Sequence, residues 1–153
     1  MNVTLKMKIQ DQEIDLAFNL TMYVTRIYRQ QYNRDILKDM AEIYNLVNPS
    51  PFAGIDFSDI TTEGKTEDEI YSQVIDKALP NYFTQREKEI LLDLETTEKA
   101  CQIAWAFAKN AGETKDYEDW ICSFDFVFPV KDVITALYDA WYKSATPIIE
   151  SKN

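Results

Sequence analysis

Residues 3–20, VTLKMKIQDQEIDLAFNL, decide the fold class of this 153-residue chain. Apolar residues stand at alternate positions from Val3 to Ile9 and again from Ile14 to Leu20, with the polar run Gln10–Gln12 between them. A period of two puts each apolar set on one face of a strand, so the pattern predicts a β-hairpin. Because an isolated hairpin is marginal in water, this face must pack on other elements.

Helical spacing of apolar residues replaces the period of two from residue 21 onward. Thr21 is the expected N-cap of the first helix, which the polar residues 33–35 interrupt before it resumes. The proline-containing run that starts at Asn48 ends this helix, since proline cannot continue it. Residues 48–65 then form one long loop, and loops of this length are usually functional or mobile.

Two capping-box sequences open later helices. Thr66 begins a short helix that is expected to end before Pro80. Thr84 begins the longest periodic segment, which ends at Gly112. A break near residues 96–97 stays open, because either threonine could cap a new helix.

Two shorter signals complete the helical region, residues 21–145. Asp116 begins a short helix, and Pro129 suits the first turn of a last helix. The sequence therefore predicts an α+β fold, mostly α, with the N-terminal β-hairpin packed on a bundle of about four to six helices. We expect residues 1–147 to form a single domain and residues 148–153 to form a flexible tail.

The composition argues against most kinds of active site. With 26 acidic and 16 basic residues, the net charge is −10, so no binding to nucleic-acid phosphates is expected. The chain has no histidine, which removes histidine bases and histidine metal ligands. Its three glycines fit no phosphate-binding loop. We therefore expect no enzyme, no metal and no cofactor.

Cysteine usage and hydropathy indicate a protein of the cytoplasm. Cys101 and Cys122 fit no metal or redox spacing and are expected to be buried, reduced thiols. No signal peptide is recognised at the start of the sequence. No apolar stretch approaches the roughly 18 residues of a membrane span, so no membrane contact is expected.

Two groups of apolar side chains are singled out. One group lies on the apolar stripes of helices and is expected in the core: Trp105, Trp120 and Trp141. The other lies in the long loop and comprises the candidate partner-binding residues Phe52, Ile55, Phe57 and Ile60. Two interpretations of the loop residues stay open: they fold back as a lid over the core, or they present an apolar segment to a protein partner.

Five segments together have a familiar arrangement. The hairpin MKIQDQEIDLAFNL (7–20) leads directly into TMYVTRIYRQQY (21–32), and a long middle region follows. Next come the alanine-rich EKACQIAWAFAKNAG (98–112), the acidic and aromatic DYEDWICSFD (116–125) and the final VKDVITALYDAWYKSA (130–145). This arrangement resembles the tail assembly chaperones of long-tailed bacteriophages and prophages, especially those of low-GC Gram-positive hosts. The most specific parts of the resemblance are AWAFAK and DYEDW.

The resemblance implies a non-enzymatic role in phage tail assembly, in the host bacterial cytoplasm. Such a chaperone binds the tape-measure protein, keeps this long helical chain soluble and promotes polymerisation of tail-tube protein around it. It is absent from the mature virion. A homo-oligomer stays open.

Many members of the family also have a longer form, made by programmed frameshifting, which would contact the tail-tube protein. For the last three residues, Ser151-Lys152-Asn153, a serine codon ending in A followed by AAA and AAC would contain the slippery heptamer A-AAA-AAC. The codons of the gene test this point.

Two other classes of function stay open. The first alternative is an acidic protein-interaction or inhibitor module, such as a DNA mimic. A protein of this class would carry carboxylates along one continuous face. The second alternative is a small enzyme that uses carboxylates or tyrosines. Such an enzyme would show a pocket with converging acids and shifted pKa values.

Overall fold

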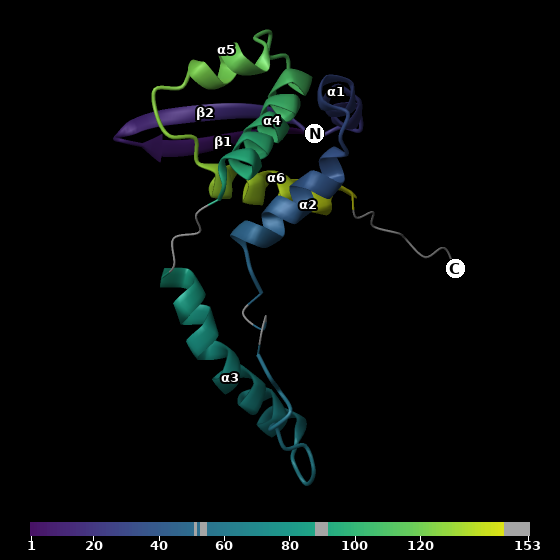
Figure 1. Ribbon diagram of the computed structural model, residues 1–153, viewed down its shortest axis with the longest axis vertical. Coiled ribbons are helices and arrows are strands. Elements are labelled where there is room, and N and C mark those ends of the chain that lie inside the picture. Colours follow the sequence, from purple (N-terminus) through teal and green to yellow (C-terminus); the bar gives the residue numbers. More distant parts are fainter. Residues whose placement is uncertain (51, 53–54, 88–91, 146–153) are drawn as a thin grey trace, which may run out of the picture. The chain divides into compact units, whose positions relative to one another are not determined.

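A computed structural model describes residues 1–50, 52, 55–87 and 92–145 of the chain, and for residues 81–87 it describes the backbone. The described residues fall into two compact units (Figure 1). The first unit contains residues 1–47 and 92–145, and the second lies between them in the sequence, from residue 48 onward. The expected flexible tail lies outside the described residues, and the single domain over residues 1–147 stays a prediction.

The N-terminal hairpin forms as predicted. Strands β1 (Asn2–Ile9) and β2 (Gln12–Asn19) pair antiparallel, with Leu5 opposite Leu16. The turn residues Gln10 and Asp11 have positive φ angles of 50° and 64°, the geometry of the tight turns that match the twist of a hairpin. One face is apolar and packs on the core: Val3, Leu5, Met7, Ile14, Leu16 and Phe18.

Helices α1 (Tyr23–Tyr32) and α2 (Ile36–Val47) follow, and the predicted interruption between them is confirmed. Asn33 ends α1 in the left-handed conformation, with φ of 53°. Asp35 then caps α2, because its Oδ1 accepts a hydrogen bond from Leu37 N at 2.9 Å. The expectation that Thr21 caps α1 is wrong, since Met22 occupies the N-cap position and makes no side-chain cap hydrogen bond. The hydroxyl of Thr21 instead accepts a hydrogen bond from Asn110 Nδ2 at 2.9 Å.

Helix α4 (Leu94–Asn110) is the central element of the first unit. It contacts β2 and the helices α1, α2, α5 (Tyr117–Cys122) and α6 (Val130–Ala145), and Figure 1 shows it crossing the hairpin. Its alanines allow this close packing, and residues 103–107 are all buried. The sequence thus gives the predicted mostly helical α+β fold, in which a hairpin packs on helices.

The two ends of α4 are fixed by local hydrogen bonds. Asp93 is its N-cap and accepts a hydrogen bond from Thr96 N at 2.7 Å, so the prediction that this helix begins at Thr84 is wrong. No break occurs at residues 96–97. At the other end Gly112 has a φ of 107°, and its N–H donates to Lys109 O at 3.0 Å, which is the predicted glycine stop.

The three tryptophans differ in burial. Trp105 and Trp120 are buried, and Trp105 Nε1 donates a hydrogen bond to Lys115 O at 3.1 Å. Trp141 is half-buried at the edge of the core, where its ring meets Phe107 at 6.0 Å. The cysteines differ in the same way: Cys101 is buried, but the expectation that Cys122 is buried is wrong.

The second unit contains helix α3 (Glu67–Glu87) and the residues that precede it. Thr66 caps α3 as predicted, since its Oγ1 accepts from Glu69 N at 3.3 Å. The prediction that this helix ends before Pro80 is wrong, because α3 continues through Pro80 to Glu87. Nucleating a separate helix costs about 4 kcal/mol, which is comparable to the roughly 3 kcal/mol that one proline inside a helix costs.

Candidate interaction surface

The long loop is fastened along α3 by polar contacts. Gln73 of α3 holds Thr61 through three hydrogen bonds: Gln73 Oε1 accepts from Thr61 N at 3.1 Å and from Thr61 Oγ1 at 3.2 Å, and Gln73 Nε2 donates to Thr61 O at 2.8 Å. Lys77 donates to Asp56 O at 2.9 Å and forms an ion pair with Asp59. These contacts occupy one side of α3 and leave another side of the helix uncovered by them.

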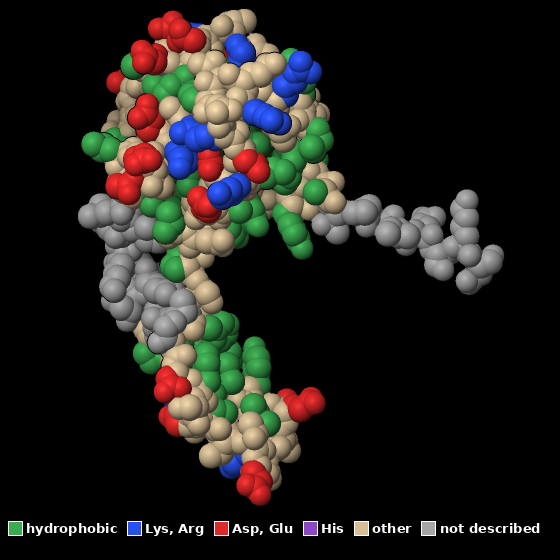
Figure 2. Space-filling model, turned by 45° about the vertical axis from the view of Figure 1, so that its right-hand side comes forward, with side chains coloured by type: hydrophobic (Ala, Val, Ile, Leu, Met, Phe, Trp, Pro, Cys, Tyr) green, Lys and Arg blue, Asp and Glu red, His purple; other side chains and the backbone are tan. Residues whose placement is uncertain are grey.

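A row of large apolar side chains follows that other side of α3. Tyr71, Ile75 and Leu79 are spaced four residues apart, so they stand on neighbouring turns of one helix face. Tyr71 is 67% exposed, Leu79 is 41% exposed and Ile75 is half-buried. We call these three residues the α3 ridge. Figure 2 shows hydrophobic side chains gathered along one side of this unit.

The predicted partner-binding residues belong to the same unit as the α3 ridge. Phe52 is 42% exposed and its ring lies 6.3 Å from that of Phe57, whereas Ile55, Phe57 and Ile60 are half-buried. Their binding to a partner stays a prediction. Sequence reasoning did not select the α3 ridge, although the four-residue spacing of Tyr71, Ile75 and Leu79 is readable from the sequence.

The second unit is acidic around these apolar residues. Its described side chains include seven carboxylates, Asp56, Asp59, Glu63, Glu67, Asp68, Glu69 and Asp76. The basic side chains described in this unit are Lys65 and Lys77, and both are engaged with carboxylates. Lys65 lies 3.8 Å from Glu69, and Lys77 pairs with Asp59. The surface beside the α3 ridge therefore carries excess negative charge.

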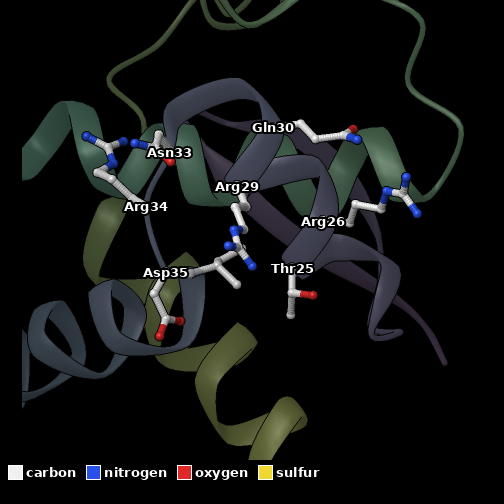
Figure 3. Close-up of a pocket in the computed structure, with 8 residues that line it drawn as sticks. Thr25, Arg26, Arg29, Gln30, Asn33, Arg34 and Asp35 are labelled. Carbon is white, nitrogen blue, oxygen red and sulfur yellow. The ribbon is translucent and has the colours of Figure 1, made fainter.

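The first unit has a hollow of about 890 Å³ beside α1 and the turn after it (Figure 3). Three arginines line it, but Figure 3 shows that Arg26 and Arg34 point to opposite ends while Arg29 extends between Thr25 and Asp35. Guanidinium groups stay protonated and cannot serve as bases. Because the arginine side chains diverge, their three guanidinium groups do not converge on one position where a small anion could bind.

Arg34 belongs instead to a partly buried network that joins α1, α2 and α4. Its guanidinium lies over the rings of Tyr28 and Tyr32, at 5.2 Å and 5.0 Å, and donates to Gln102 Oε1. Arg34 Nε also lies 3.5 Å from Asp39 Oδ2, which accepts a hydrogen bond from Tyr28 OH at 2.7 Å. Asp39 is buried, so these partners offset the cost of removing its carboxylate from water.

The tyrosines around this network are neutral near pH 7. Burial, and then the hydrogen bond to Asp39, raises the pKa of Tyr28 above its usual value. Burial raises the pKa of Tyr32 to about 12 and also raises the pKa of Tyr117. The rings of Tyr32 and Tyr117 meet that of Trp105 edge to face, at 6.2 Å and 6.4 Å. The cluster is therefore a packed structural junction, in which raised pKa values follow from burial.

Neither a metal site nor a membrane span is found in the residues that the structure describes. No group of three or more cysteine, aspartate or glutamate side chains there could hold a metal ion. Of the described helices, none has the length and hydropathy needed to cross a membrane. In comparisons with protein-family models, with curated proteins and with solved structures, the chain has no match.

Proposed function

We propose that this protein is a non-enzymatic tail assembly chaperone of a long-tailed phage or prophage. It binds the tape-measure protein in the host cytoplasm and keeps it soluble until tail-tube protein polymerises around it. The sequence resemblance in residues 7–32 and 98–145 supports this family. The observation that carries the binding role is the α3 ridge, with Tyr71 and Leu79 exposed on an acidic unit.

The proposed action follows from the physics of the client. A very long amphipathic helix exposes apolar stripes, and such stripes aggregate unless another surface covers them. An apolar row on a helix can cover part of a stripe through side chains at i, i+4 and i+8. The net charge of −10 on this chain adds solubility to the complex.

Co-expression tests the function. The chain is produced together with the very long helical protein encoded immediately downstream of its gene, and the soluble fraction of that protein is measured. We expect the client to be insoluble alone and to co-purify with this chain when both are present. An unrelated acidic protein of similar size and charge is the control. Client solubility that is the same with the control, or no co-purification, would refute the function.

The predicted partner-binding loop is tested in the same assay. Phe57→Ser together with Ile60→Ser is expected to lower the amount of client that co-purifies, because both side chains belong to the unit that carries the α3 ridge. Circular dichroism, which includes the helical signal of α3, is the control for an intact second unit. Co-purification at the wild-type level would remove these loop residues from the binding surface.

A further inference from the structure

We propose that the α3 ridge, Tyr71, Ile75 and Leu79, binds a basic amphipathic helix of the client. The inference rests on the proposed chaperone function and adds the chemical class of the segment that is recognised. Three features of the second unit support it: the spacing of the ridge, the acidic row beside it and the pairing of the nearby lysines.

The spacing of the ridge fits one helix. Residues four apart in a helix are separated by about 40° of rotation and about 6 Å of rise. Tyr71, Ile75 and Leu79 therefore form a stripe about 12 Å long that is narrow enough for a single helix to cover. A partner helix would meet this stripe with apolar side chains at i, i+3, i+4 and i+7.

The row beside the ridge sets the charge of the partner. Asp68, Ser72 and Asp76 also have four-residue spacing, and all three are exposed. Asp68 precedes Tyr71 by three residues, and Asp76 precedes Leu79 by three, so the two rows are neighbours on the helix surface. Lysine or arginine residues that flank the apolar face of a bound helix would lie near Asp68 and Asp76.

The charge around the α3 ridge also favours a basic partner over a second copy of this chain. Lys65 and Lys77 are each paired with a carboxylate of the same unit, so they do not neutralise the row of Asp68 and Asp76. A second copy that met this surface through its own α3 ridge would bring another acidic row of Asp68 and Asp76. A basic helix gains attraction where another copy would add repulsion.

Synthetic peptides test the proposal on the full chain. Three labelled 20-residue peptides are titrated and followed by fluorescence anisotropy. One has a leucine face and a lysine face, one has the same leucine face with glutamate, and one has the lysine composition in a scrambled order without amphipathic spacing. We expect the ordered lysine peptide to bind at least tenfold more tightly than either of the others.

Variants then locate the binding. Tyr71→Ala with Leu79→Ala is expected to weaken binding of the lysine peptide at least tenfold, since alanine keeps the helix but removes the ridge. Asp68→Asn with Asp76→Asn is expected to weaken binding several-fold and to reduce its dependence on salt. Tyr23→Ala is the matched control, because Tyr23 of α1 is 59% exposed and lies outside the second unit. Thermal melts confirm that each variant is folded.

The outcomes separate this inference from the proposed function. Equal binding of the ordered and scrambled lysine peptides, or wild-type binding by the ridge variant, overturns the inference. If wild-type chain and ridge variant solubilise the long client equally in co-expression, the chaperone function stands and this surface is wrong. If the lysine peptide needs the ridge but the client is not solubilised, the surface stands and the function is wrong.

Discussion

Replacing Trp105 by alanine should destabilise the first unit more than the same change at Trp141, because Trp105 is buried and Trp141 is half-buried. Trp105 is 2% exposed, and a buried tryptophan removes about 150–250 Å² from water, worth about 4–6 kcal/mol at 25 cal/mol per Å². The alanine recovers part of this area, which leaves the usual loss of about 3–5 kcal/mol for such a change. Lys115 O also loses its hydrogen bond from Nε1, at a cost of about 1 kcal/mol.

Trp141→Ala is the matched comparison. Its side chain is half-buried and meets Phe107 at the edge of the core, so about half of the buried area is at stake. We expect a loss of about 2 kcal/mol, roughly half of that at Trp105. The two changes remove the same atoms, so the difference between them measures burial together with the hydrogen bond from Trp105 Nε1.

Urea unfolding followed by tryptophan fluorescence is the assay. All three tryptophans lie in the first unit, so the two that remain in each variant report on that unit alone. With a slope of about 1–3 kcal/mol per molar urea, a loss of 4 kcal/mol lowers the midpoint by about 2 M. An unchanged midpoint for Trp105→Ala, or an equal loss for both variants, would refute the assignment of Trp105 to the centre of the core.

Three further changes test the junction and the turn at the end of α4. Raising the pH from 9 to 11.5 should lower the urea midpoint. Burial raises the pKa of Tyr32 to about 12 and also raises that of Tyr117, so above about pH 10 the unfolded chain loses these protons before the folded chain does. A midpoint that is constant over this range would contradict the burial of these hydroxyls. Tyr28→Phe should cost about 1–3 kcal/mol in the same assay, since buried Asp39 loses a donor, and a loss below 0.5 kcal/mol would show that this hydrogen bond is dispensable. Gly112→Ala should cost about 1–2 kcal/mol, because a φ of 107° strains the backbone of alanine. No heavy atom lies within 4 Å of the added Cβ, so a steric clash adds nothing to this cost. Thermal unfolding at the wild-type temperature would contradict this strain.

Elements with strong local signals could be predicted from the sequence. The period of two in residues 3–20 gives the hairpin, and the turn, the interruption near Asn33, the cap at Thr66 and the glycine stop at Gly112 are all confirmed. Each depends on the chemistry of a few adjacent residues, such as a hydroxyl that accepts from a nearby N–H. Such signals need no knowledge of the rest of the fold.

Predictions that depended on competition between signals were less successful. Thr84 can act as an N-cap only if the residues before it are not helical. In the structure α3 continues through Pro80 to Glu87, so Thr84 lies inside a helix. Thr21 has the right side chain for a cap, yet Asn110, far away in the sequence, uses its hydroxyl instead. Burial is also set by tertiary structure, so a stripe residue such as Trp141 ends half-buried and Cys122 ends exposed.

The candidate surface could be predicted in part. The loop residues that the sequence predicts to bind a partner belong to the second unit, which also contains the α3 ridge. The ridge itself was missed, because apolar residues at helical spacing usually face a core. Only the structure distinguishes a stripe that is covered from one that leaves side chains such as Tyr71 and Leu79 exposed.

The order of synthesis follows from the placement of the second unit between the two parts of the first. The hairpin and α1 and α2 leave the ribosome before α4, the helix that covers them in the folded unit. At about 5–20 residues per second, residues 48–91 take roughly 2–9 seconds to translate. During that time the apolar faces around Phe18 and Met40 have no α4 to pack against. The codons of the middle segment therefore set how long the nascent chain is itself at risk of aggregation, without changing any residue of the first unit.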